Sequence, residues 1–479
     1  MGMRIDDLTG LNSELVASMP VVFDISAAKA AASDDQAGPM SVAGMRHCQG
    51  GHTVSPGGRT ALTTASMNRI GTPRAVANQP WAALVEVEAG ATWGELHQVL
   101  GPFGYAPMIQ QSSADFSIGG SLSVNCHSRD PRWGPLVDSV EDITVLTGIK
   151  DQATGDLITV TASRSQNDDL FKAALGGYGA CGFILSVTLR VVENRMLRYV
   201  GDACARTLDE YVAHAQTLLA QTGGPVQLHY AWFNCVRGSL YANALVTDFI
   251  DEGGPVPQTD GYAEEPWGQD EFLRAGWSAA RKSPRFFRGI VWNELLERHT
   301  TPSETGKDHV ATRINWLRSA VSFTGYRGHT DTEVLQEYFV PVSRAAELML
   351  MLRKLFRQSK AVNVLSTTLR VVRADKSTVL SYCPENRMCV AVDMAVPTVV
   401  SNGQNFIHPE ALACLSDAIE AALACGGSFY LPYYKVATVE QFARAYPNHG
   451  TLRTAMNKYN PLQDGRRRFW NNFLARYLG

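Results

Sequence analysis

Clusters of glycine constrain the fold of this 479-residue chain more than any other sequence feature does. Three clusters lie in the first 182 residues, at 44–52, 117–129 and 176–182, each beside a short apolar run. Glycine lets the main chain approach a ligand or another segment at distances that a Cβ atom would block. The first part of the chain is therefore predicted to consist of short strands joined by tight turns that pack closely.

The two halves of the chain differ in their predicted elements. In the first half, strands are expected at 40–43, 84–89, 143–147, 157–161 and 183–192, and helices at 92–101 and 168–175. Thr92 and Glu95 have the spacing of a capping box, which supports the first of these helices. After about residue 195, longer helices are expected at 208–220, 341–354 and 409–424, and strands at 226–233, 337–342, 363–372 and 388–395. The fold class is therefore α+β, with an antiparallel sheet covered by helices in the second domain.

Three other segments differ from the rest of the chain in amino-acid composition. Residues 251–269 are rich in Gly, Pro and acidic residues and are expected to form a surface loop. The chain from 439 onward is expected to be helical and rich in aromatic residues, and the basic run RRRFW at 466–470 is predicted to be a solvated helix face.

Length, charge and cysteine usage exclude several classes of protein. A chain of this length is expected to form two or three domains. With 43 basic and 46 acidic residues the net charge is −3, which gives no general reason to bind nucleic acid or an anionic membrane. No apolar stretch is long enough to cross a bilayer, and the start lacks the pattern of a secretory signal. The nine cysteines contain no C-x-x-C pair, so buried thiols and a cytoplasmic location are expected.

The third glycine cluster matches a dinucleotide-binding fingerprint only in its spacing. Gly177, Gly179 and Gly182 form G-x-G-x-x-G. That fingerprint requires a preceding strand and a following helix, whereas here a helix precedes and a strand containing Ile184 follows. A nucleotide can still lie against this loop, but a Rossmann turn is excluded.

The first cluster follows the short strand at 40–43. Successive main-chain N–H groups in such a loop can bind a pyrophosphate, and basic or donor side chains add to that character. The alternative is a plain turn between strands. The candidate binding residues are Gly44, Arg46, His47, Cys48, Gln49, Gly50, Gly51 and His52.

The second cluster alternates small and apolar residues and ends in a polar group. Small side chains let a flat ring or a phosphate lie on the main chain. The alternative is a tightly packed buried strand. The candidate binding residues are Ile118, Gly119, Gly120, Ser123, Asn125 and Cys126.

Taken in order, these segments resemble the flavoprotein family of p-cresol methylhydroxylase and vanillyl-alcohol oxidase. The resemblance covers about residues 40–192 and rests on GMRHCQGGHT, VEVEAGATWGELHQVL, FSIGGSLSVNCHSRDPRWGPLVDSVEDITVL and DDLFKAALGGYGACGFILSVTLRV. In the second half, LQEYFVPV, GGSFYLPYYKVATVEQFARAYP and LRTAMNKYNP resemble alditol oxidases and decaprenylphosphoryl-ribose oxidases. The resemblance implies a PCMH-type FAD-binding domain at 1–195, a substrate or cap domain at 196–438 and a C-terminal segment at 439–479 that returns to the first domain.

The resemblance also implies a function. FAD would oxidise a small, hydroxylated organic substrate by hydride transfer to flavin N5 and be reoxidised by oxygen or another acceptor. In relatives with a covalent flavin a histidine of the first loop bonds to the ring. The matching residue is His47, with His52 as the next candidate, and the alternative is that His47 only hydrogen-bonds FAD. The stretch QQSSADFSIGG holds no cysteine for a second bond.

The candidate catalytic residues lie mostly outside the three glycine clusters. Cys126 and His127 lie where the family places groups near the flavin ring. If residues 430–435 form a strand, Tyr433 and Lys435 share a face, and Lys435 is the candidate base. The family's lysine aligns with Tyr433 instead, so the alternatives are a partnering tyrosine and an exposed lysine without a role. Further candidates in the cap domain are Gln336, Tyr338 and Arg370.

Two other functions stay open. One is a flavin-dependent tailoring enzyme that dehydrogenates or cyclises a natural-product intermediate. The other is a non-catalytic protein that keeps the flavin fold and binds a ligand. The sequence predicts no oligomeric state.

Overall fold

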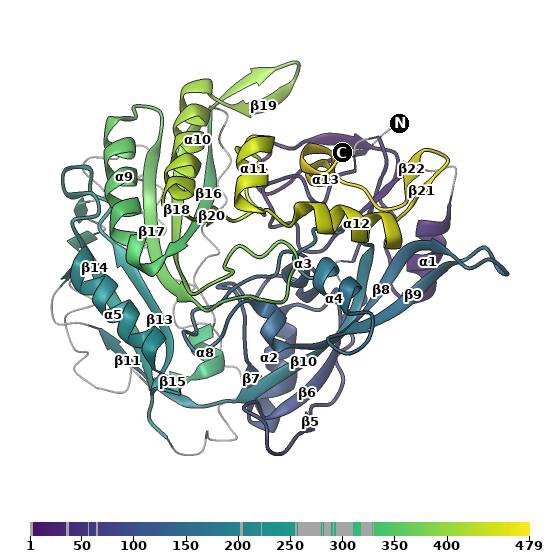
Figure 1. Cartoon of the computed structure of the whole chain (residues 1–479), viewed down its shortest axis with the longest axis horizontal. Coiled ribbons are helices and arrows are strands. Elements are labelled where there is room, and N and C mark those ends of the chain that lie inside the picture. Colours follow the sequence, from purple (N-terminus) through teal and green to yellow (C-terminus); the bar gives the residue numbers. More distant parts are fainter. Residues whose placement is uncertain are drawn as a thin grey trace.

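The structure of the chain is a computed structural model (Figure 1). It describes residues 3–479 except 35–37, 56, 64–65, 202–204 and 222, most of 254–309 and most of 318–329. Within the last two ranges only 256, 279, 281, 289, 290, 292, 293 and 328 are described. The loop predicted at 251–269 therefore lies largely outside the described residues.

An antiparallel sheet organises the first part of the chain. Its strands are β5 (Arg74–Ala75), β6 (Ala83–Glu88), β10 (Phe183–Glu193), β8 (Val140–Lys150) and β9 (Leu157–Ser163), in that order, and β7 (Tyr105–Pro107) also pairs with β10. The helices α2 (Trp93–Leu100), α3 (Ile118–Ser123) and α4 (Asp168–Ala174) connect them. A separate parallel pair, β3 (Met40–Ala43) and β4 (Arg59–Leu62), holds both ends of the first glycine loop. The short pair β1 (Met3–Ile5) and β2 (Glu14–Val16) and the helix α1 (Ile25–Ser33) precede it.

A larger antiparallel sheet follows. Its order is β15 (Val310–Thr312), β11 (Met196–Gly201), β14 (Asn243–Asp251), β13 (Val226–Phe233), β17 (Asn363–Val372), β18 (Arg387–Ser401), β16 (Asp331–Pro341) and β20 (Ser428–Phe429). β12 (Arg206–Thr207) and β19 (Gln404–Ile407) pair at its margins. The helices α5 (Leu208–Ala220), α9 (Ala345–Gln358) and α10 (Pro409–Ala424) cover one face, and α8 (Arg313–Leu317) lies at the edge beside β15 (Figure 1).

The C-terminal segment lies beside the first part of the chain (Figure 1). It contains α11 (Val439–Ala445), α12 (His449–Tyr459), the hairpin β21 (Leu462–Gln463) and β22 (Arg466–Arg467), and α13 (Asn472–Tyr477). The buried side chain of Asn460 donates to the carbonyl oxygens of Ala180 at 3.1 Å and Phe469 at 2.7 Å. α12 packs against α4 of the first part. The change from one sheet to the other falls between β10 and β11. The bounds of the three predicted domains stay a prediction.

The strands and helices agree closely with those expected. The capping box of Thr92 and Glu95 is present at the start of α2. One expectation is wrong: residues 466–470 are not a helix face, because Arg466–Arg467 lie in a hairpin. Of the two alternatives for residues 117–129, the buried strand is not found, since they contain the short helix α3. Residues 430–435 form a turn beyond β20, so the condition for a face shared by Tyr433 and Lys435 is not met.

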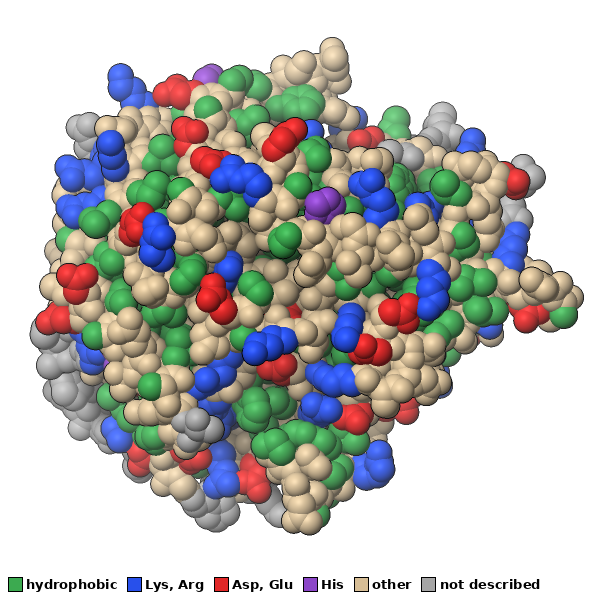
Figure 2. Space-filling view, in the orientation of Figure 1, with side chains coloured by type: hydrophobic (Ala, Val, Ile, Leu, Met, Phe, Trp, Pro, Cys, Tyr) green, Lys and Arg blue, Asp and Glu red, His purple; other side chains and the backbone are tan. Residues whose placement is uncertain are grey.

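Charged side chains are spread over one face of the molecule, and most of the described cysteines are buried thiols. Basic and acidic side chains are interspersed over the face in Figure 2 and do not gather by sign. None of the helices in the described part of the chain is long and apolar enough to cross a membrane. Eight described cysteines are free thiols, and all but Cys48 are buried. The cytoplasmic location stays a prediction.

A buried ion pair joins the two sheets. Arg313 of α8 lies 2.9 Å from the Asp130 carboxylate, and both side chains are 0% exposed. The same guanidinium donates to the carbonyl oxygen of Met108, which lies just beyond β7 of the first sheet. Arg132 also contacts Asp130, at 2.7 Å. This pair is therefore a fixed contact between the second sheet and the loop after α3.

We expect Arg313→Met to lower the free energy of unfolding by about 3 kcal/mol, because it removes one partner of a buried charge pair. The shift in the midpoint of denaturant unfolding measures this. Arg444→Met is the matched control, since Arg444 and Glu420 form a pair with side chains 53% and 47% exposed, and we expect it to cost less than about 1 kcal/mol. Equal losses in the two variants would contradict the structural importance of the buried pair.

Candidate functional site

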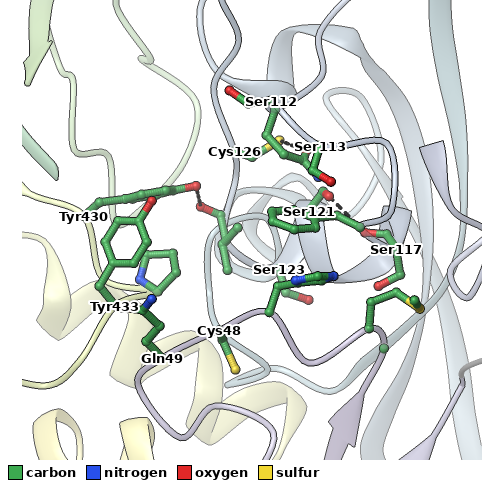
Figure 3. Close-up of a pocket in the computed structure, with 18 of the residues that line it drawn as sticks. Cys48, Gln49, Ser112, Ser113, Ser117, Ser121, Ser123, Cys126, Tyr430 and Tyr433 are labelled. Atoms are coloured by element: carbon green, nitrogen blue, oxygen red, sulfur yellow. Dashed lines mark hydrogen bonds between the residues drawn. The ribbon is translucent and has the colours of Figure 1, made fainter. Parts of the chain in front are cut away.

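A large cavity lies between the two sheets. Its volume is about 870 Å³, near the upper end of the range for ligand pockets, which is roughly 300–1,000 Å³. Its lining comes from the first glycine loop, from α3, from the 178–184 turn, from the second sheet and from residues 469–471. Figure 3 shows serines of the 112–123 segment on one side and Tyr430 and Tyr433 on the other, with Cys48 and Gln49 of the first loop between them.

Glycine permits the close packing of the cavity bed. A Cβ atom added at Gly44 would lie 2.1 Å from Ser117 Oγ, and one at Gly119 would lie 2.6 Å from Ala89 Cβ. Gly182 has a φ of +136°, and its added Cβ would lie 2.2 Å from the carbonyl oxygen of Leu146. At Gly119 and Gly182 these contacts exclude a side chain, and at Gly44 a side chain would require Ser117 to move. They bring the loop after β3, the start of α3 and the turn before β10 to one wall.

The first loop presents His47 to the cavity. The His47 ring packs on Phe116 with centroids 4.2 Å apart. Burial lowers the pKa of His47, and the nearby Asp115 carboxylate opposes that shift only in part. The ring is therefore neutral at pH 7 and has a lone pair available. His52, deeper in the same loop, stacks on Phe473 at 4.8 Å, and its pKa is lowered to about 3 by burial and then by the charge of Lys435.

Gln49 ties the first loop to the second sheet. Its main-chain N–H donates to the carbonyl oxygen of Pro432 at 2.8 Å. Its side-chain Oε1 accepts from the N–H of Leu335 at 3.0 Å, and its carbonyl oxygen accepts from Asn12 Nδ2 at 2.8 Å. Three hydrogen bonds of Gln49 therefore fix the position of the first loop.

Strand alternation decides which residues of β16 reach the cavity. Glu333, Leu335 and Glu337 line it. Gln336 and Tyr338 point to the other face, where the Tyr338 hydroxyl donates to Gln336 Oε1 inside the core. The prediction of Gln336 and Tyr338 as site residues is therefore wrong, since it selected the correct strand and the wrong face. The residue that sequence reasoning missed is Glu337, and the period of two along LQEYFVPV is the signal that could have found it.

Glu337 is the centre of a buried acid–base cluster. Its Oε2 lies 2.7 Å from His127 Nε2, and its Oε1 accepts from the Tyr433 hydroxyl at 2.9 Å. Burial by itself would raise the pKa of Glu337, but the charge and hydrogen bond of His127, then Arg370 and Tyr433, hold it below its usual value. Burial raises the pKa of Tyr433 well above its usual value, so its hydroxyl stays protonated. Glu337 is therefore an ionised carboxylate in the wall of the cavity.

Arg370 and an aromatic wall complete the side formed by the second sheet. Arg370 lines the cavity on β17 and donates to Ser112 Oγ at 3.3 Å. Farther along, Phe249 packs on Trp316 with centroids 4.7 Å apart. The aromatic residues of this wall are Tyr199, Tyr230, Trp232, Phe249 and Trp316. One end of the cavity is therefore polar and charged, and the other is lined mainly by aromatic rings.

Lys435 does not line this cavity. Because residues 430–435 form a turn, Tyr433 and Lys435 do not share a strand face, and Lys435 contacts a small separate pocket with Gln336. Burial lowers the pKa of Lys435. The structure therefore separates the predicted base from the cavity and leaves Tyr433 in it.

Most of the predicted site residues line the cavity. They are Gly44, Arg46, His47, Cys48, Gln49, His52, Gly119, Gly120, Ser123, Cys126, His127, Gly179, Gly182, Ile184, Arg370 and Tyr433. Cys126 donates to Gln111 Oε1 at 3.0 Å, and burial raises the pKa of its thiol to about 12. Their individual roles stay predictions.

Five predicted cofactor residues do not line it, and each has a structural reason. Ile118 belongs to the core, and an added Cβ at Gly177 would lie 1.9 Å from the carbonyl oxygen of Ala173. Asn125 accepts from the N–H of Val137 at 2.9 Å. Gly50 and Gly51 are packed against neighbouring residues at distances of 2.5–3.3 Å from an added Cβ. In the structure these five positions therefore contribute to packing and local hydrogen bonding.

The cavity suits an elongated dinucleotide. The glycine bed lets a ligand lie directly on the main chain. Two buried donors beside the cavity, Gln111 Nε2 and Arg370 Nε, have no hydrogen-bond partner within the described part of the chain. A ligand with carbonyl or phosphate oxygens would satisfy such donors. The residues present therefore fit FAD.

Comparison with known proteins gives the same assignment for the first domain. Residues 24–151 match the family model of the FAD binding domain. Cytokinin dehydrogenase 7 of Oryza sativa subsp. japonica is 30% identical over 218 residues, which is 44% of this chain and 38% of that protein. L-Galactono-1,4-lactone dehydrogenase 2, mitochondrial, of the same plant is 29% identical over 268 residues, 52% of this chain and 42% of that protein. The matches thus span less than half of each of these relatives.

The fold extends over the whole chain in solved structures. Cholesterol oxidase from B. sterolicum superposes with a TM-score of 0.70 at 13% identity, covering 100% of this chain and 97% of that chain. A solvent-stable cholesterol oxidase superposes with a TM-score of 0.69 at 15% identity, covering 99% and 97%. The closer likeness to alditol and decaprenylphosphoryl-ribose oxidases stays a prediction. The match over residues 24–151 assigns FAD binding to that part of the chain, and the two cholesterol oxidase structures share its fold over the whole chain.

Proposed function

We propose that the protein is an FAD-dependent oxidoreductase that oxidises a small, hydroxylated organic compound. This proposal rests on the two regions of the structure that the cavity connects. The cavity runs from the glycine bed of the FAD-binding domain to the ionised Glu337 on the second sheet. A substrate in that space would contact an acid–base cluster at one end and the aromatic wall at the other.

FAD, when bound, would supply the redox chemistry by accepting a hydride, which is two electrons and one proton, from the substrate carbon. The residues of the chain perform the remaining tasks. The cluster of His127, Glu337 and Tyr433 takes the proton of the substrate hydroxyl. Glu337 fixes the other two groups through its two oxygens, since one bonds to His127 and the other to Tyr433. Arg370 favours the ionised form of Glu337 through its positive charge.

The other end of the cavity selects the substrate body. Five aromatic side chains form a wall there, and the guanidinium of Arg129 lies 5.7 Å from the Tyr230 ring centroid. Such a wall buries an apolar or planar group, while the charged end orients a hydroxyl. The same observation supports the second candidate, a tailoring enzyme that acts on a larger natural-product intermediate. A ligand-binding protein without turnover would not need the acid–base cluster.

We further propose that His47 holds the flavin covalently and that oxygen or another acceptor reoxidises it. The support is the position of His47 on the cavity wall and its lowered pKa, which keeps the ring neutral and nucleophilic.

The spectrum of the purified protein tests the cofactor and its attachment. We expect yellow protein whose colour stays in the pellet after acid precipitation, and His47→Ala should move the colour to the supernatant. His408→Asn, a change at the N-cap of α10, is the control and should keep the colour in the pellet. Pellet colour in His47→Ala would refute covalent attachment through His47, and a colourless wild-type protein without affinity for added FAD would refute the function.

Rapid mixing with substrate alcohols under anaerobic conditions tests the acid–base cluster. We expect Glu337→Gln to slow flavin bleaching by about 10²- to 10⁴-fold, because the amide can neither hold the proton nor stabilise a charged His127. Tyr433→Phe should slow it less. Lys435→Met is the matched control, because Lys435 lies outside the cavity, and its rate should equal that of wild type. A normal rate in Glu337→Gln would exclude the cluster as the base.

A further inference from the structure

Two histidines and an aspartate converge on the face of the second sheet that points away from the cavity. His214 lies on α5, His229 on β13 and Asp248 on β14. His214 Nε2 is 3.0 Å from Asp248 Oδ2, and His229 Nδ1 is 2.7 Å from Asp248 Oδ1. All three ligand atoms lie within 4.8 Å of one another. Three separate elements therefore bring metal-binding atoms to one point.

The three ligand atoms are close enough together to bind one ion. Bonds from a divalent first-row metal to imidazole nitrogen or carboxylate oxygen are about 2.1 Å, so two ligands lie about 3.0 Å apart at right angles and about 3.4 Å apart in the tetrahedral geometry of Zn²⁺. His214 and His229 lie 3.0 Å and 2.7 Å from different oxygens of Asp248, so an ion would replace these two hydrogen bonds. Two histidines and one carboxylate on one side of an ion form a known arrangement that leaves other positions open.

The surroundings of His229 resemble the outer shell of a metal site. Its other ring nitrogen, Nε2, lies 3.2 Å from the hydroxyl of Tyr211, and both side chains are fully buried. Its main-chain N–H donates to the carbonyl oxygen of Arg129 at 2.7 Å. These contacts fix the ring with Nδ1 toward Asp248, as partners of metal-bound histidines do.

The cluster is open to solvent on one side. The side chains of His214 and Asp248 are 18% and 14% exposed, whereas that of His229 is 0% exposed. An ion can therefore enter beside His214 and keep water in its open positions. The charge of Arg206 acts on His229 and disfavours a cation, so Asp248 is the group that must offset the charge of the ion.

We propose that His214, His229 and Asp248 bind one divalent first-row transition-metal ion such as Zn²⁺. The ion cross-links α5 to β13 and β14. Since Tyr230 follows His229 on β13 and lines the cavity, the bound ion stiffens the strand that carries part of the aromatic wall. The proposal is independent of the reaction at the flavin.

Calorimetric titration of Zn²⁺ into chelator-treated holoprotein tests the proposal. We expect one site, and both His214→Asn and Asp248→Asn should weaken it by at least about 100-fold. Tyr211→Phe should weaken it by about tenfold, because it removes only a partner of a ligand. His408→Asn is the matched histidine control and should bind Zn²⁺ as wild type does. Far-UV circular dichroism and the flavin spectrum show whether each variant is folded.

Thermal unfolding gives a second measurement. Zn²⁺ should raise the Tm of wild type and of His408→Asn and leave that of His214→Asn unchanged. Absence of Zn²⁺ binding would overturn the proposal and leave a network of hydrogen bonds only. Binding that persists in His214→Asn and Asp248→Asn but is lost in Cys389→Ser would also overturn it, because the ion would then sit with His127 and Glu337.

Discussion

The cavity depends on main-chain segments that approach more closely than side chains allow. A Cβ atom at Gly44 would lie 2.1 Å from Ser117 Oγ, and one at Gly119 would lie 2.6 Å from Ala89 Cβ. Both distances are shorter than a normal contact. These contacts place the first loop and α3 side by side, although more than 60 residues separate them in the sequence. Without them the bed would be filled by side chains, and a dinucleotide could not lie on the backbone.

The second sheet depends on a different constraint, the alternation of strand side chains. On β16, one set of residues packs in the core while Glu333, Leu335 and Glu337 face the cavity. Glu337 is buried, and a buried carboxylate is tolerated only when it is paired. His127 and Tyr433 supply that pairing from segments far away in the sequence. The pairing therefore stabilises the carboxylate and also places an acid–base cluster beside the FAD-binding domain.

The same alternation gives β13 and β14 two faces with different chemistry. Tyr230 and Phe249 face the cavity, whereas His229 and Asp248 face α5. Residues of the outer face and of the cavity wall therefore alternate along the same two strands. The ion proposed at His214, His229 and Asp248 would bind these strands without touching the ligand.

The sequence by itself determined most of the elements and the α+β class, because propensity and alternation are local properties. Glycine spacing indicated Gly44 and Gly119 as close-packed positions, whereas the FAD-binding role of these segments and of His47 came from their resemblance to a flavoprotein family. The sequence did not determine which face of 335–342 meets the cavity, and it placed Lys435 on a strand that the chain replaces with a turn. Only the tertiary structure brought His127, Glu337 and Tyr433 together, since a contact between residues 127, 337 and 433 depends on how two sheets pack and not on any local pattern.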